Sequence, residues 1–124
     1  MSKFQYPRVR TFIAGADLSA KKYHAVKLHT TENQVVAAAA GQGIGILLNA
    51  PQAGEAAEVA MLGGGAMGDA GATVAAGNEV AANAAGKLIP AVSTNIVLGI
   101  ALSGAASGEY FEMERTYYVK AWGG

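Results

Sequence analysis

Two stretches of the sequence resemble each other at a separation of 54 residues: GILLNAPQAGEAAE at residues 45–58 and GIALSGAASGEYFE at residues 99–112. Six of the 14 aligned positions are identical without a gap, and four of these six pairs are neither Ala nor Gly. The same offset aligns apolar residues upstream, namely Val26 with Val80, Val35 with Ile89 and Ile44 with Leu98. The sequence therefore predicts an internal duplication, with copies near residues 17–65 and 71–119.

The second copy decides whether the segment after the shared loop is a helix or a strand. GEAAEVAML at residues 54–62 favours a helix by composition, because it is rich in Ala, Glu and Met. Its equivalent at residues 108–119, GEYFEMERTYYV, is rich in Tyr, Phe and Val and alternates in part, which favours a strand. If the copies share a fold, both segments are strands.

The remaining apolar segments complete the predicted fold. A hairpin is expected around the polar turn at residues 30–33, and its counterpart turns at residues 83–86, where Gly86 can supply a positive φ. Short apolar strands follow at residues 44–48 and 97–102. The predicted class is all-β, a small barrel or sandwich built from two tandem repeats of 54 residues, with extended N- and C-terminal arms.

A single domain is expected over residues 1–124. Residues 1–12 are predicted to be an N-terminal arm and residues 120–124 a tail, both outside the barrel. The glycine-rich residues 63–71 are predicted to link the two copies.

Composition excludes several classes of function. The 124 residues carry nine basic and nine acidic side chains, so a strongly basic nucleic-acid binder is not expected. The chain has no Cys and two His, which argues against thiolate or multi-His metal sites. The most apolar stretch, residues 44–50, is far shorter than a membrane span, and MSKFQYPRVR does not resemble a signal peptide. We expect a soluble protein with no nucleic-acid or membrane partner.

The charges are unevenly distributed along the chain. Residues 1–27 hold six of the nine basic residues and one acid, whereas residues 28–86 hold five acids and neither Lys nor Arg. The pattern predicts a basic N-terminal arm on an acidic body. Either the arm is a solvated terminus or it docks on an acidic neighbour.

The sequence contains no catalytic constellation. The glycine-rich stretches at residues 41–45 and 63–68 lack the Gly-Lys-Ser/Thr of a phosphate loop. His24 and His29, five residues apart, should face opposite sides of one strand, and no Ser lies in a nucleophile elbow. The acids shared by the two copies should lie on solvated strands, because a spacing of three places strand residues on opposite faces: Glu55, Glu58, Glu109 and Glu112. We predict no enzyme, no catalytic residues, no cofactor and no metal.

Aromatic residues are concentrated near the two ends of the chain. Aromatic residues and Arg are favoured anchors at protein interfaces. Part of this group is expected to fill the core of the second copy, including Tyr110, Phe111 and Tyr117. The residues outside the copies are predicted to lie in an interface with a partner or a neighbouring subunit: Phe4, Tyr6, Arg8, Arg10 and Trp122.

The segment TFIAGADLSAKKY at residues 11–23, followed by VKL at residues 26–28, resembles the start of small capsid cement, or head decoration, proteins of tailed bacteriophages. The twice-used pattern of Gly-Ile-x-Leu, a short loop and Ala/Ser-Gly-Glu-x-x-Glu is similar to the same family, and the resemblance covers most of residues 11–116. It implies a β-rich structural protein of the virion. Such a protein binds the outer surface of an assembled head, often as homotrimers, and staples neighbouring major capsid subunits. The resemblance brings no catalytic residues.

The alternative is a non-catalytic β-barrel that binds a ligand such as a carbohydrate. A module of that kind needs exposed aromatic side chains on one concave face.

Overall fold

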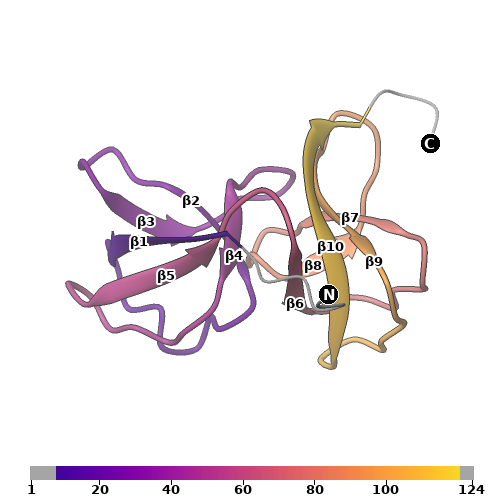
Figure 1. Cartoon of the computed structure of the whole chain (residues 1–124), viewed down its shortest axis with the longest axis horizontal. Coiled ribbons are helices and arrows are strands. Elements are labelled where there is room, and N and C mark those ends of the chain that lie inside the picture. The colour runs from indigo at the N-terminus through magenta and orange to yellow at the C-terminus, as the bar shows by residue number, and fades with distance from the viewer. Residues whose placement is uncertain (1–7, 121–124) are drawn as a thin grey trace, which may run out of the picture.

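The computed structural model describes residues 8–120, in which every regular element is a β-strand (Figure 1). The first half of the chain forms a closed barrel in the order β1-β3-β2-β4-β5. Its strands are β1 (Val9–Ala14), β2 (Ala25–Leu28), β3 (Gln34–Ala37), β4 (Gly45–Leu47) and β5 (Ala56–Ala60). The predicted all-β class with a small barrel is therefore confirmed.

The second half of the chain forms a five-stranded sheet beside the barrel, in the order β6-β10-β9-β7-β8 (Figure 1). Its strands are β6 (Gly65–Asp69), β7 (Glu79–Ala82), β8 (Leu88–Pro90), β9 (Ile96–Ala101) and β10 (Tyr110–Val119). A parallel bridge between Ala70, just after β6, and Leu88 joins the two edge strands of this sheet. Residues 8–120 contain no helix that is long and apolar enough to cross a membrane.

Several strand pairings recur in the two sheets at the predicted offset. β2 pairs with β4 as β7 pairs with β9, and β4 pairs with β5 as β9 pairs with β10. The partners shift together by 54 residues: Ala25–Ile46 corresponds to Glu79–Ile100, and Leu47–Val59 to Ala101–Met113. A common origin of the two halves stays a prediction. It requires matching strand registers, and these pairings have them.

Two expectations about the boundaries of the fold are wrong. Residues 9–12, assigned to an arm outside the barrel, belong to β1, which pairs with β5 along Val9–Ile13 and buries Phe12. The glycine-rich linker contains β6, which pairs with Tyr110–Glu114. Glycine serves close packing here, because a Cβ added at Gly68 would lie 2.6 Å from side-chain atoms of Leu88 and Met113.

The hydrophobic core has two parts. One lies inside the barrel and includes Phe12, Leu18 and Val35. The other is shared by both sheets, with Ile46 and Ala60 from the barrel packed among residues of the second sheet such as Leu98, Phe111 and Met113. The two sheets therefore stabilise each other by burying apolar surface between them.

Candidate docking surface

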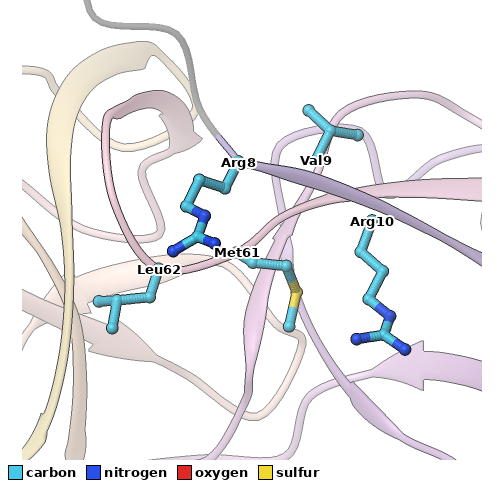
Figure 2. Close-up of a pocket in the computed structure, with 5 residues that line it drawn as sticks. All are labelled: Arg8, Val9, Arg10, Met61 and Leu62. Atoms are coloured by element: carbon cyan, nitrogen blue, oxygen red, sulfur yellow. The ribbon is translucent and has the colours of Figure 1, made fainter.

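A shallow open groove lies where the N-terminal end of β1 meets the residues that follow β5. Its volume is about 310 Å³, and it is lined by Arg8, Val9, Arg10, Met61 and Leu62 (Figure 2). The N–H of Met61 donates a hydrogen bond of 2.6 Å to the carbonyl of Arg8, which fixes one wall of the groove against the other. Small-molecule sites enclose most of their ligand, so an open groove suits a protein segment better.

The two arginines point into the groove from the same side of the chain. Figure 2 shows Arg8 and Arg10 on one side of the strand and Val9 on the other, as strand alternation requires. The Arg10 guanidinium lies 5.9 Å from the centroid of the Phe12 ring. Neither arginine is within 4.0 Å of a carboxylate of the described residues. Both guanidinium groups are exposed and able to bind an anionic partner.

The structure brings together two of the five predicted contact residues, Arg8 and Arg10. Arg10 lies on a paired strand and not on an arm, so its position is set by the barrel. Phe4, Tyr6 and Trp122 lie outside the described residues.

The C-terminal end of β10 is a second candidate for docking, because this strand extends past its neighbour β6. On the β6 side, the last backbone hydrogen bond of β10 is donated by the N–H of Arg115 to the carbonyl of Gly64, over 2.8 Å. β10 then has a bulge between Arg115 and Tyr118 and continues against β9 to Val119. Within residues 8–120, no strand pairs with the other edge of residues 116–119.

Side chains and backbone hold this overhanging end in place from its paired side. The carboxylate of Glu79 on β7 accepts hydrogen bonds from the Tyr118 hydroxyl and the Lys120 ammonium group. The Lys120 bond and then the Tyr118 bond hold the pKa of Glu79 below its ordinary value, and the Glu79 bond raises the pKa of Tyr118 to about 12. The backbone of Lys120 also bonds to Thr94 and Asn95, over 2.9 and 2.8 Å.

The exposed side of the overhanging end is apolar. Tyr117 is 45% exposed and Val119 is 62% exposed. An unpaired strand edge presents backbone N–H and C=O groups that can pair with a strand of another chain. The end of β10 is therefore a rigid edge on which an extended segment of a partner can add.

A buried arginine, which the sequence analysis did not single out, ties β10 to the barrel. Arg115 is 3% exposed, and its guanidinium donates to the backbone carbonyls of Ala60 (3.3 Å), Ile44 (3.1 Å), Thr116 (2.8 Å) and Leu98. Burial lowers the pKa of Arg115 to about 10, so the group is charged at neutral pH. The signal was present in the alternation of β10, where Arg115 follows Phe111 and Met113 at an inward position.

His24 forms a second polar contact between the sheets. Its Nε2 lies 2.9 Å from the Asp69 carboxylate on β6, and its Nδ1 lies 3.3 Å from the carbonyl of Ala85. The expectation that His24 and His29 share one strand is wrong, because the two residues flank β2. His24 is buried, whereas His29 is exposed and accepts a bond from the N–H of Thr31.

The acids shared by the two halves support turns or face solvent. Glu55 accepts a bond of 2.7 Å from the N–H of Gln52, and Glu109 accepts one of 2.9 Å from the N–H of Ala106. Glu58 and Glu112 are exposed on β5 and β10. No group of three or more His, Asp or Glu within the described chain is placed to hold a metal ion.

These features define a class of protein. The described residues form a compact pair of packed sheets, and the buried side chains of His24 and Arg115 bond to backbone carbonyls or across the sheets. Within residues 8–120, an open groove and a strand edge that no other strand pairs with are available to a partner. Such features are typical of a structural protein that docks on other proteins.

The comparisons with known proteins identify the family. The model of the phage cement protein family matches residues 17–115, so the chain belongs to that family, as its sequence resemblance predicted. The chain is thus a capsid-associated structural protein of a bacteriophage virion.

A solved structure is similar in fold. The crystal structure of the head fiber gp8.5 N base in bacteriophage phi29 superposes with a TM-score of 0.71 at 17% sequence identity. The match covers 90% of this chain and 95% of that chain. At this identity the likeness shows the fold alone. No curated protein matches the sequence.

Proposed function

We propose that the protein decorates the outer surface of an assembled phage head and staples neighbouring major capsid subunits, which stabilises the capsid. Membership of the cement family supplies the partner. The observation that carries the proposal is the unpaired edge of residues 116–119, held rigid by Glu79 and exposing Tyr117 and Val119. A rigid edge loses little conformational entropy when a capsid segment adds to it.

The five predicted contact residues belong to this proposal. Phe4, Tyr6, Arg8, Arg10 and Trp122 contact the capsid or a neighbouring copy. The protein acts without catalysis, as a single domain whose halves arose by duplication, and it assembles as a homo-oligomer, a trimer. A trimer that engages several capsid subunits gains avidity by factors on the order of 10²–10⁴ without new kinds of contact.

The carbohydrate-binding alternative finds less support. It requires aromatic side chains that line one concave surface, and the groove described above is lined by arginine and aliphatic residues and by methionine. Two of the exposed tyrosines of β10, Tyr117 and Tyr118, lie instead at its overhanging end.

The edge can be tested by proline substitution. Both backbone groups of Lys120 bond to the β8–β9 connection, so those of Val119, one residue earlier, point to the unpaired edge. Val119→Pro removes an N–H from that edge without removing a bond to β9. Val119→Thr, the matched control, keeps the N–H and the shape of the side chain.

The assay uses expanded heads that lack the protein and counts bound copies by quantitative mass spectrometry. We expect copies near one per major capsid protein, heads that resist a higher temperature, and binding at least tenfold weaker for Val119→Pro. The control should bind within twofold of wild type. Equal binding by the proline variant would exclude the edge as the contact, and no binding by wild type would overturn the decoration role.

A further inference from the structure

Two exposed pairs of opposite charge have the same spacing on two different strands of the protein. Arg8 and Arg10 occupy alternate positions at the start of β1, and Glu112 and Glu114 occupy alternate positions on β10. All four side chains are exposed. Alternate residues of a strand are about 6.6 Å apart and point to one side, so the cations and the anions form ladders of equal length.

We propose that Arg8 and Arg10 of one copy bind Glu112 and Glu114 of a second copy in the oligomer. This inference rests on the self-association in the proposed function and specifies its contact. Arginine suits the role because its planar guanidinium binds a carboxylate through two parallel hydrogen bonds.

The other acids of the described residues are not available as such a ladder. Glu79 binds Tyr118 and Lys120, and Asp69 binds His24. The remaining committed acids accept bonds from neighbouring backbone N–H groups: Asp17, Glu55 and Glu109. Glu32 and Glu58 lie far apart in the sequence, so they are not alternate residues of one strand. Glu112 and Glu114 are thus the pair of uncommitted carboxylates on one strand face.

Apolar surface beside each ladder can be buried in the same contact. Tyr110 precedes Glu112 by two residues, is 53% exposed, and is braced edge-on against Tyr23 with ring centroids 5.0 Å apart. Leu62, beside the arginines, is 54% exposed. Joining the ladders would bring a braced aromatic residue toward the apolar part of the groove, which adds hydrophobic burial to the ion pairs.

The two ladders belong to different strands of one copy, so the contact can repeat head to tail from copy to copy. Each copy donates one ladder to the next copy and accepts one from the previous copy. A contact of this kind closes into a ring when the rotation between copies permits it.

Charge reversal tests the contact in the purified full-length protein. The variants are R8Q/R10Q, R8E/R10E, E112K/E114K and the quadruple variant with both reversals. E32K/E58K is the matched control, because it changes the net charge as E112K/E114K does but leaves both ladders intact. Sedimentation velocity over a range of concentrations gives the association constant, and circular dichroism confirms that each variant is folded.

We expect each two-residue ladder variant to weaken association at least tenfold, and the quadruple variant to return within about fivefold of wild type. The control should match wild type, and added NaCl should weaken wild-type association. A wild-type monomer at every concentration, unchanged association of R8Q/R10Q, or a quadruple variant that stays monomeric would each overturn the contact.

The head-binding assay separates this inference from the proposed function. If the ladder variants associate as well as wild type and decorate heads to the same extent, the contact between copies is excluded and the decoration role stands. If wild type does not bind heads but associates through the ladders, the decoration role is excluded and the contact between copies stands.

Discussion

Replacing Arg115 by methionine should destabilise the protein strongly, although it removes a buried charge. The side chain is 3% exposed and donates to carbonyls in both halves of the chain, including those of Ala60 and Ile44 in the barrel. Methionine is the natural choice because Met61 stands at the equivalent position of the first half, 54 residues earlier. It preserves much of the side-chain volume and removes the five donors.

The magnitude follows from two opposing terms. Each hydrogen bond from a charged group contributes about 1.5–3 kcal/mol, and three of them reach carbonyls beyond the adjacent residue. Burial lowers the pKa of Arg115 to about 10, which corresponds to a cost of roughly 3 kcal/mol for holding the cation there. Methionine avoids that cost but leaves the carbonyls without their donor. We expect the free energy of unfolding to fall by about 2–5 kcal/mol.

Urea denaturation at pH 7, followed by circular dichroism, measures this change. With a slope of about 1–2 kcal/mol per molar, the midpoint should fall by roughly 1–5 M. Arg8→Met, at an exposed arginine, is the control and should remain within about 0.5 kcal/mol of wild type. An R115M variant as stable as wild type would refute the reasoning, because it would mean that desolvation of the cation cancels its bonds.

Three further predictions follow from other contacts. Glu79→Gln should lower the denaturation midpoint at pH values above 4.5, the ordinary pKa of a Glu side chain. The pKa of Glu79 in the folded protein lies below 4.5, so the difference between variant and wild type should shrink as the pH falls through that folded pKa. A similar shrinkage in Glu32→Gln would argue against a role of the Glu79 bonds to Tyr118 and Lys120. Gly68→Ala should cost about 1–3 kcal/mol in thermal denaturation by overpacking the core, and unchanged stability would show that Leu88 and Met113 can move aside. Deleting residues 2–7 should leave the melting temperature within a few degrees of wild type. Deleting residues 2–10 removes the Val9 and Arg10 pairings of β1 and should lower the melting temperature clearly. Equal melting temperatures of the two deletion variants would contradict the role of that part of β1.

Much of the fold could be predicted because pairing information is repeated in the sequence. The Ala-rich residues 56–60 form a strand against their helix propensity, as the aromatic equivalent in β10 indicated. Propensity differences are small, and sheet pairing with burial of Ala57 and Val59 outweighs them. The turn at residues 83–86 also behaves as predicted, with Gly86 at φ 84°.

The strands that were not predicted are β1 and β6, and each has a physical reason. β1 begins with VRT, whose side chains are exposed, so its first residues lack the alternation that marks a half-buried strand. β6 is GAMGD, a composition that favours turns, and its glycines are explained by neighbours distant in the sequence. A comparison of the two halves of the sequence therefore predicts neither β1 nor β6.

The candidate site was predictable only in part for a related reason. Arg8 and Arg10 were found from their charge and their position outside the copies. Their setting beside Met61 and Leu62 depends on the β1–β5 pairing, which only the structure reveals. Arg115 was missed because charged residues are expected at the surface, and its partners are carbonyls that leave no mark in the sequence.

The candidate docking features lie at places where the two halves stop matching. The 54-residue offset holds for the pairings of β4 with β2 and β5, whereas the β7–β8 register is shifted by one residue relative to β2–β3. β6 is displaced by two residues relative to β1 in its pairing, since Ile13 pairs with Ala56 and Asp69 with Tyr110. β5 ends at Ala60, whereas β10 continues five residues past the equivalent Glu114 and ends at the unpaired edge. At position 61 the barrel has a methionine in an open groove, and at position 115 the second sheet has a buried arginine that braces that edge. The matching inner pairings thus stabilise both halves, and the divergent ends are available for two different contacts, as the proposed stapling of neighbouring subunits requires.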